Sequence, residues 1–308
     1  MKRFLVKVLI IVATLLIPLY IADYLLTKDY RSRNYYPFST WTDLVNGQLN
    51  SDLWILGSSR AWVQYNPRII ENSLNVSSYN LGCNAQFLFL DLQCYEIAKA
   101  YNPKPKYILL DIAWPSLTME TTSISRYFYM PYVNDKRFRK IVKNNDNISS
   151  YYLYIPCYRF LMEKESDKYY INDSSYEYKG YKAKDCNWIA LELNSVDSVK
   201  YSCEPKAVAL LESFIQECKK DTIFVILIHS PMYYEGFKKI QNNDKMLNLF
   251  QNIANRNNVP FLDYTKDPIC YDTMNFYNAM HLNAHGADLF STKLAHDLDS
   301  LGLIPARK

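Results

Sequence analysis

Two hydroxyl side chains follow a short apolar run near the start of the chain. Gly57, Ser58 and Ser59 come directly after the stretch LWIL. Glycine allows the backbone angles of a sharp turn, and a hydroxyl presented on such a turn can act as a nucleophile. The same position also suits a serine that caps a helix, and the triplet alone favours this structural role. Residues elsewhere in the chain must decide between the two roles.

Two later segments could complete a site around such a serine. Gly82 and Asn84, in the stretch YNLGCN, can offer a backbone N–H and a side-chain amide to a developing oxyanion. His281, in the stretch NAMHLNAHGA, could take the proton of a serine hydroxyl. Taken singly, the first segment also fits an ordinary strand-to-helix turn, and the second a histidine near a helix start. Only their combination with Ser59 indicates acyl transfer.

The apolar pattern predicts how these residues are brought together. Runs rich in branched residues alternate with helix-like segments, which predicts a three-layer α/β sandwich with a parallel five-stranded sheet covered by helices on both faces. The predicted strands are Leu53–Leu56, Ser78–Leu81, Tyr107–Ile112, Thr222–His229 and Val259–Leu262. The predicted helices are Pro67–Leu74, Phe87–Tyr101, Pro205–Lys219, Phe237–Asn257 and Ala284–Leu301. Ligands of such sheets bind at the carboxyl ends of the strands, where Ser59 and Gly82 both fall.

Residues 1–27 are interpreted as an N-terminal transmembrane helix. Basic residues precede an uncharged run, and Phe4 to Leu26 supplies about 23 mostly apolar residues, enough to span a bilayer. A cleaved signal peptide is the alternative, although Tyr20-Ile21-Ala22 provides only one of the two small residues that cleavage needs. A buried helix of a soluble protein is a third interpretation. The basic flank predicts a cytoplasmic N-terminus and an extracytoplasmic main domain, in a single-pass protein of the inner or plasma membrane.

The remaining organisation follows from composition. Residues 28–50 are interpreted as a stalk, and residues 51–303 as the α/β domain, with an insertion at about 115–200 that forms a lid or subdomain. The net charge of +4 gives no indication of nucleic-acid binding. The 7 cysteines and 4 histidines lack metal-ligand spacing, and no glycine-rich phosphate motif occurs, so neither a metal nor another cofactor is expected.

The three blocks, in this order, resemble the SGNH/GDSL hydrolase superfamily over most of residues 51–301. More narrowly, GSSR with a downstream NPRII, then YNLG and HLNxxGA, are similar to membrane-anchored SGNH-like proteins of polysaccharide O-acylation, among them alginate and teichoic-acid modification proteins. The resemblance implies that Ser59 is the nucleophile, because Gly57-Ser58-Ser59 stands where the family has Gly-Asp-Ser. It also implies that His281 is the general base. The amides of Gly82 and Ser59 would then hold the oxyanion, with Asn84 assisting.

One departure from the family concerns the residue behind His281. The aspartate of the triad would fall at position 278, where this chain has Asn278. An amide oxygen can fix the tautomer of His281, but it cannot neutralise an imidazolium. Asp272 or Asp263 could take over that role, or the site could work as a Ser–His dyad.

A second departure is the absence of a GxND block after the third predicted strand, where LDIAWP stands instead. One oxyanion donor is therefore unassigned. Asp111 and His229 lie at predicted strand ends and are candidates for lining the site. Ser58 and Arg60 flank the nucleophile and are further candidates for binding substrate.

Two functions are weighed on this basis. The first is a membrane-tethered, extracytoplasmic serine esterase or O-acyltransferase that acts on a cell-surface polysaccharide through an acyl-serine intermediate. The resemblance implies a membrane-bound O-acyltransferase as donor partner. The alternative is a catalytically degenerate SGNH-like protein that binds glycan or scaffolds such an acyltransferase, which Asn278 favours. A plain α/β domain without a site is a third interpretation.

Overall fold

The structure is a computed structural model that describes residues 1–84, 88–118, 126–145, 150–163, 177–186, 188–189 and 198–307. The chain forms two compact units. One contains Met1–Asn46 and Ser123–Asp173, and the other contains Gly47–Thr122 and Ser174–Lys308. The interval 115–200, predicted as an insertion, is thereby divided between the two units. The predicted start of a helix at Phe87 lies outside the described residues.

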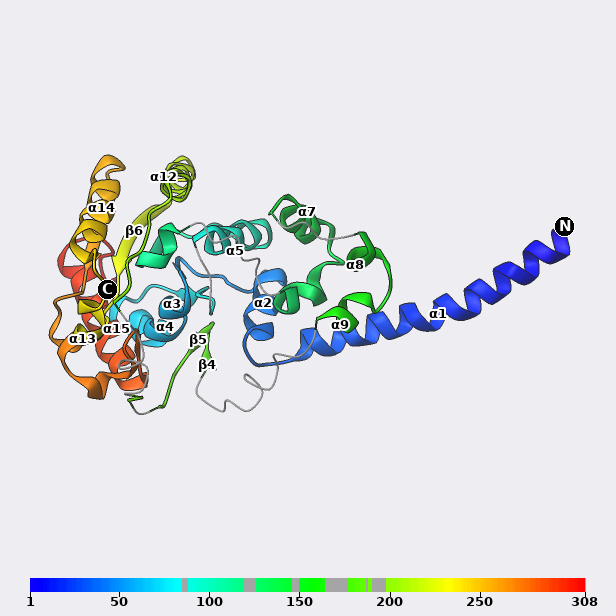
Figure 1. The fold of residues 1–308 in the computed structure, drawn as a ribbon, viewed down its shortest axis with the longest axis horizontal. Coiled ribbons are helices and arrows are strands. Elements are labelled where there is room, and N and C mark those ends of the chain that lie inside the picture. Colours follow the sequence, from blue (N-terminus) through cyan, green and yellow to red (C-terminus); the bar gives the residue numbers. More distant parts are fainter. Residues whose placement is uncertain are drawn as a thin grey trace. The chain divides into compact units, whose positions relative to one another are not determined.

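The larger unit is built on five parallel strands in the order β2-β1-β3-β6-β7 (Figure 1). They are β1 (Leu53–Leu56), β2 (Ser78–Asn80), β3 (Tyr107–Asp111), β6 (Phe224–His229) and β7 (Phe261–Asp263). In the register of the sheet, Leu53 lies between Ser78 and Tyr107. All four side chains of β1 are buried, as expected for a strand covered on both faces. The predicted parallel five-stranded sheet is confirmed.

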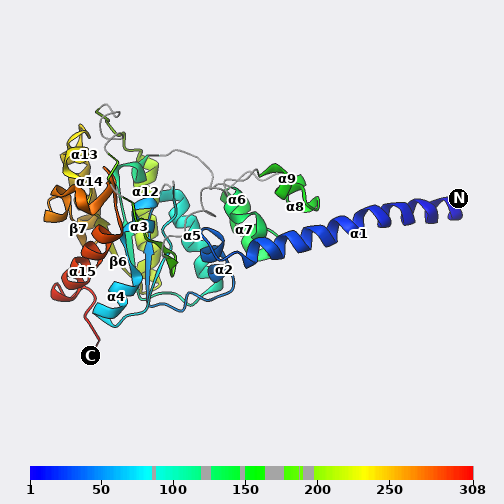
Figure 2. The same cartoon turned by 90° about the horizontal axis from the view of Figure 1, so that it is seen from below.

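One face of the sheet is covered by α4 (Pro67–Leu74) and α15 (Ala284–Ser300) (Figure 2). Leu53 and Ile55 of β1 belong to the same buried cluster as Ile70 of α4 and Phe290 of α15. Successive strand residues point to opposite faces of a sheet, so Leu53 and Ile55 share one face of β1 and Trp54 lies on the other. Burial of this apolar surface holds the last helix of the chain against the first strand.

The opposite face is covered by α5 (Leu88–Tyr101) and α12 (Pro205–Lys220). The rings of Trp54 and Tyr95 lie 6.2 Å apart between centroids, and those of Tyr95 and Phe214 lie 5.0 Å apart, both edge to face. Helix α14 (Asn243–Arg256) packs on the edge strand β7 through Phe250 and Phe261. The predicted helical layers on both faces of the sheet are therefore present.

One predicted helix, Phe237–Asn257, is broken in two. Helix α13 covers Tyr234–Lys238, and α14 begins at Asn243. Between them the side chain of Asn242 accepts from the amide of Tyr201 at 3.2 Å and donates to its carbonyl at 2.8 Å. Asparagine side chains often bond to the backbone in this way, and here the bonds tie Asn242 to a distant segment instead of a continuous helix.

Short elements complete the larger unit. They are α3 (Ser59–Gln64), the 3₁₀ helices η1 (Trp114–Leu117), η3 (Pro268–Tyr271) and η4 (Thr273–Asn275), and two antiparallel hairpins. The hairpins pair β4 (Glu177–Tyr178) with β5 (Tyr181–Lys182), and β8 (Phe276–Asn278) with β9 (His281–Leu282). The sequence pattern predicted none of these elements, because each is too short to carry a recognisable period.

The smaller unit is helical. It contains α1 (Lys2–Ser32), α2 (Phe38–Val45), α6 (Arg126–Tyr129), η2 (Met130–Tyr132), α7 (Lys136–Asn145), α8 (Ser150–Tyr154) and α9 (Tyr158–Met162). Among the described residues, α1 is the one helix long and apolar enough to cross a membrane. Its apolar side chains are exposed, but Asp23 forms an ion pair of 2.7 Å with the buried Arg159 of α9. The polar end of the apolar segment is thus fixed within this unit.

Candidate active site

The first strand delivers its carboxyl end to the point where the strand order reverses. β1 lies between β2 and β3, so the chain leaves β1 at the position where ligands of doubly wound sheets bind. Gly57 follows β1 with a φ of +140°, and a Cβ at this residue would lie 2.9 Å from the carbonyl oxygen of Asp111. Only glycine fits this turn, which leads directly into α3 at Ser59.

Ser59 and His281 form a hydrogen-bonded pair. Ser59 Oγ lies 2.8 Å from Nε2 of His281, although 222 positions separate the two residues in the chain. His281 opens β9, and the short β8–β9 hairpin places it opposite Asn278. Both side chains of the pair are half-buried. A nucleophile and a base within hydrogen-bonding reach are the central pair of a serine acyl-transfer site.

Asn278 holds the other side of the imidazole. Its Oδ1 lies 2.9 Å from Nδ1 of His281 and also accepts the backbone amides of Met280 and His281, each at 3.0 Å. An oxygen facing Nδ1 favours the tautomer with the proton on that nitrogen, because the oxygen can only accept. Nε2 is then left as the acceptor for the hydroxyl proton of Ser59. Tyr277 stacks on the imidazole with an interplanar angle of 9°.

The two aspartates considered as substitutes for Asn278 are used elsewhere. Asp272 accepts the amide of Met274 at 2.9 Å, and Asp263 accepts the amide of Thr265 at 2.9 Å. Each therefore organises its own turn through a local side-chain-to-backbone bond. Of the candidates for the third position, Asn278 is the one bonded to Nδ1 of His281.

The surroundings of His281 oppose its protonation. Burial, together with the positive charges of Arg60 and Lys184, lowers the pKa of His281 to about 3. The imidazole is therefore neutral at pH 7 and free to accept a proton, but an imidazolium formed during reaction would lack the compensating carboxylate of a Ser-His-Asp triad.

Gly82 and Asn84, predicted to help hold the oxyanion, lie in the loop that follows β2. The amide of Gly82 donates to Asn80 Oδ1 at 2.8 Å, so this donor is already paired. A Cβ at Gly82 would lie 2.4 Å from the backbone nitrogen of Trp62. The close packing of this loop on α3 therefore requires a glycine at position 82. Asn84 is half-buried and lies next to residues 85–87, which are outside the described part of the chain. Ser59 opens α3, so its own N–H has no acceptor within that helix.

Arg60, Asp111 and His229 come together in the core, with exposed fractions of 1%, 2% and 0%. Arg60 Nη1 lies 3.2 Å from Nε2 of His229, and its Nε lies 3.9 Å from Oδ1 of Asp111. Ser230 Oγ accepts from Nη2 of the same guanidinium at 2.8 Å. These side chains are not accessible to a substrate in this structure, and we interpret the cluster as the support of the turn that carries Ser59.

The same cluster has strongly perturbed ionisation. Burial raises the pKa of Asp111, and the Arg60 charge opposes this shift. Burial and Arg60 both hold the pKa of His229 well below its usual range, so this imidazole is neutral. Tyr65 donates to Asp111 Oδ2 at 2.6 Å. Sequence reasoning did not identify Tyr65 or Ser230, whose proximity to Arg60 arises only from the tertiary fold.

Two further side chains belong to segments that contact α3 or the β8–β9 hairpin. Ser58 occupies the N-cap position of α3, but its hydroxyl makes no capping hydrogen bond. Lys184 was not identified from the sequence, because it lies in the tyrosine-rich interval and in no motif. It is 7% exposed, and its Nζ lies 5.1 Å from the centre of the Trp62 ring.

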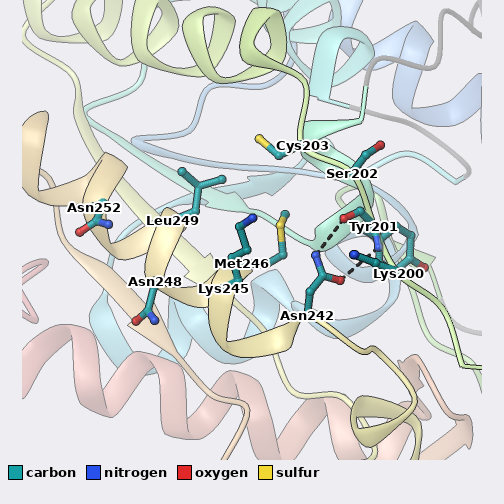
Figure 3. Close-up of a pocket in the computed structure, with 10 residues that line it drawn as sticks. All are labelled: Lys200, Tyr201, Ser202, Cys203, Asn242, Lys245, Met246, Asn248, Leu249 and Asn252. Atoms are coloured by element: carbon teal, nitrogen blue, oxygen red, sulfur yellow. Dashed lines mark hydrogen bonds between the residues drawn. The ribbon is translucent and has the colours of Figure 1, made fainter.

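A cavity of about 730 Å³ lies elsewhere in the larger unit (Figure 3). It is lined by Lys200, Tyr201, Ser202, Cys203, Asn242, Lys245, Met246, Asn248, Leu249 and Asn252. Neither Ser59 nor His281 belongs to this lining, so we do not assign the cavity to the Ser59–His281 pair. Within the described ranges, no three His, Cys, Asp or Glu side chains gather as a metal site would require.

No protein-family model matches the chain, and no curated protein matches it either. Several solved structures are similar to it. A protein from Desulfitobacterium hafniense, named for the G-D-S-L lipolytic family, has a TM-score of 0.39 at 11% identity, over 80% of this chain and 99% of its own. An acetylxylan esterase from Geobacillus stearothermophilus has a TM-score of 0.42 at 13% identity, over 84% of this chain and 97% of its own. A family two carbohydrate esterase from Clostridium thermocellum has a TM-score of 0.43 at 10% identity, over 82% of this chain and 65% of its own.

Proposed function

We propose that the protein is a serine esterase or O-acyltransferase of SGNH type that works through an acyl-Ser59 intermediate. One observation carries the proposal: Ser59 Oγ lies 2.8 Å from Nε2 of a histidine whose Nδ1 is held at 2.9 Å by Asn278. This is the order of nucleophile, base and orienting group that acyl transfer requires. Ser59 follows the carboxyl end of β1, the position where ligands of doubly wound sheets bind.

The reaction follows from this arrangement in two halves. His281 takes the proton of Ser59 while Oγ bonds to the ester carbonyl carbon, and the carbonyl electrons move to its oxygen. The backbone N–H of Ser59 supports that oxyanion. When the carbonyl re-forms, the C–O bond to the alcohol breaks, and His281 returns the proton to the departing alcohol. Water or a sugar hydroxyl then attacks the acyl-serine in the same way, which gives hydrolysis or transfer.

The location and substrate form the finer part of the proposal. Helix α1 is long and apolar enough to cross a membrane. The basic residues before the apolar run support our proposal that the N-terminus is cytoplasmic and the α/β unit extracytoplasmic. A tethered site of this kind suits a cell-surface polysaccharide as acceptor and a membrane-bound O-acyltransferase as acyl donor. The similarity of the GSSR, YNLG and HLNxxGA blocks to polysaccharide O-acylation proteins supports both assignments.

The test of this function uses the full chain in detergent with 4-nitrophenyl acetate. We expect release of nitrophenol and an acetyl group on Ser59, both abolished by Ser59→Ala. Ser58→Ala is the matched control, because it removes the adjacent hydroxyl and leaves the Ser59–His281 pair intact. A nitrophenol rate that Ser59→Ala leaves unchanged would disprove the proposed nucleophile. Addition of oligosaccharide acceptors distinguishes transfer from hydrolysis by the appearance of acetylated sugar.

A second function is favoured by Asn278 alone. The neutral amide of Asn278 lacks the charge that a triad carboxylate supplies, which favours a protein that binds glycan or scaffolds an acyltransferase without catalysing a reaction. If the wild type gives neither turnover nor adduct, and Asn278→Asp gives both, the degenerate function is correct and the catalytic one is wrong.

A further inference from the structure

Residues 150–162, which contain α8 and α9 and are called the α8–α9 segment below, pack on the C-terminal part of α1 (Figure 1). The amide of Cys157, in the turn before α9, donates to Asp23 Oδ1 at 2.8 Å. Arg159 Nη2 donates to Asp23 Oδ2 at 2.7 Å and to Thr27 Oγ1 at 2.8 Å. The charge of Asp23 is therefore compensated by the α8–α9 segment.

These contacts fix the level of the α8–α9 segment along α1. The thiol of Cys157 lies 3.4 Å from the carbonyl oxygen of Leu19, which belongs to the apolar run of α1. Leu19 precedes Leu26, the end of that run, by only about 10 Å along the helix. The run from Phe4 to Leu26 is about as long as the hydrocarbon core of a bilayer is thick. A bilayer that covers this run therefore also reaches the turn at Cys157.

The exposed surface of the α8–α9 segment is apolar. Its sequence, SYYLYIPCYRFLM, contains one charged residue, Arg159, which is 2% exposed and paired with Asp23. Its exposed large side chains, with exposed fractions from 44% to 73%, are Tyr151, Tyr154, Ile155, Leu161 and Met162. So many exposed apolar side chains within so short a segment, without a surface charge among them, indicate an interaction site.

The same level of α1 carries exposed tyrosines. Tyr20 and Tyr24 directly follow Leu19 and Asp23 in the chain, and they are 57% and 65% exposed. Tyrosines are enriched where a membrane meets water, because the ring suits the apolar layer and the hydroxyl reaches the headgroups. The tyrosines of α1 and of the α8–α9 segment therefore fit one boundary between lipid and water.

Helix α7 adds positive charge beside this surface. The guanidinium of Arg139 lies 5.3 Å from the centre of the Tyr154 ring, which brings α7 next to α8. Lys136 and Lys140 of the same helix are exposed. An apolar surface bordered by basic side chains is typical of segments that lie in the interface of a bilayer, where lipid phosphates face water.

We propose that the α8–α9 segment is embedded in the face of the bilayer at which α1 ends, with Leu161 and Met162 among the acyl chains. The inference rests on the proposed membrane location of α1 and is independent of the chemistry at Ser59. The ion pair of Asp23 with Arg159 then allows a charged position of α1 to enter this boundary in compensated form. Two elements hold the helical unit at the membrane, which restrains its rotation about α1.

Site-specific cross-linking to lipid tests the inference in the full chain, reconstituted in vesicles of phosphatidylcholine and phosphatidylglycerol. The photoreactive residue 4-benzoylphenylalanine replaces Leu161 in one variant and Met274 in its matched control, since both side chains are apolar and 73% exposed. In a third variant it replaces Ile17, in the apolar run of α1, as the reference for a position that faces lipid. Mass spectrometry after irradiation measures the fraction of each chain that carries a phospholipid.

We expect the lipid-linked fraction at position 161 to be within about twofold of that at position 17. It should exceed the fraction at position 274 by about fivefold or more, because an embedded segment is surrounded by acyl chains and a solvent-exposed one is not. Thermal unfolding of each variant checks that it is folded. Turnover of 4-nitrophenyl acetate by the same vesicles tests the function of Ser59 separately.

Four results would overturn the inference. Lipid adducts at position 17 without adducts at position 161 would show that α1 alone enters the bilayer. Equal fractions at positions 161 and 274 would show that the segment meets lipid no more than a water-facing surface does. A covalent dimer from position 161, in place of the lipid adduct, would show that the surface binds a second copy of the chain. If position 17 is not linked to lipid either, the proposed membrane location of α1 is wrong as well.

Discussion

Asn278 Oδ1 lies 2.9 Å from Nδ1 of His281, where a serine triad carries a carboxylate. The contact fixes the tautomer and orientation of the imidazole without adding negative charge. Ser59 is thus paired with a well-placed but weakly basic histidine, since burial and two cations already lower the pKa of His281.

Replacing Asn278 with aspartate should activate the site toward neutral esters. A carboxylate on Nδ1 raises the pKa of His281 and stabilises the imidazolium, so we expect kcat/KM for 4-nitrophenyl acetate to rise by about tenfold or more. Asn278→Leu, which removes the acceptor of three N–H groups, should lower the rate instead. Unchanged rates in both folded variants would contradict the role assigned to position 278.

The pH–rate profile should reflect the lowered pKa of His281. The base works when neutral, so kcat/KM should stay level as pH falls from 7 to about 4 and decline only toward about 3, in brief assays. In Asn278→Asp the decline should begin at higher pH. A wild-type decline centred near pH 6.5 would show that His281 titrates normally and would contradict the electrostatic description.

Two histidines, His229 and His281, should each make the folded chain less stable as the pH falls. His229 and His281 bind protons more weakly in the folded chain than in the unfolded one, because burial and Arg60 lower the pKa of both. The unfolded chain therefore takes up more protons as pH falls below about 6.5, and stability decreases toward acid. Urea titrations at pH 7 and 5 measure this loss, which should shrink in His229→Gln.

Arg60 should matter for folding more than for substrate binding. Arg60→Met leaves Asp111 buried without its cation, which we expect to cost about 3 kcal/mol of unfolding free energy in urea titrations. Arg68→Met, at an exposed position of the neighbouring helix α4, is the control and should change stability by about 0.5 kcal/mol or less. Equal stability of Arg60→Met and wild type would refute the supporting role of the cluster.

Gly82 should tolerate no side chain. The Cβ of Gly82→Ala would lie 2.4 Å from the backbone nitrogen of Trp62, so the start of α3 must shift and Ser59 with it. We expect a loss of about 2 kcal/mol in stability together with a lower kcat/KM. Gly302→Ala, where nothing lies within 4 Å of the new Cβ, should cost about 1 kcal/mol for its positive φ and leave kcat/KM unchanged.

The strands and long helices were predictable because their signals are local. Leu53–Leu56 and Pro67–Leu74 match the structure residue for residue, since a buried apolar run and a proline at the helix start identify such elements. The break between α13 and α14 was not predictable, because the hydrogen bonds of Asn242 reach a segment about forty residues away in the chain.

The site was predictable only in part. The motif blocks pointed to Ser59 and His281, and Asn278 was identified by its distance of three positions from the histidine. The pairing of the Gly82 amide with Asn80 and the position of Lys184 depend on contacts between distant segments. No periodicity in the sequence encodes such contacts. Arg60 was included as a neighbour of the nucleophile, yet its burial with Asp111 and His229 is visible only in three dimensions.

Mass spectrometry of the full chain, after incubation with 4-nitrophenyl acetate and an acid quench, tests the acyl-Ser59 intermediate most directly. We expect one acetyl group on the peptide that contains Ser59, assigned to Ser59 by fragmentation. The adduct should be absent in Ser59→Ala, present in Ser58→Ala, and formed faster in Asn278→Asp. Acetylation at Ser58 instead, or no adduct and no turnover in either the wild type or Asn278→Asp, would contradict it.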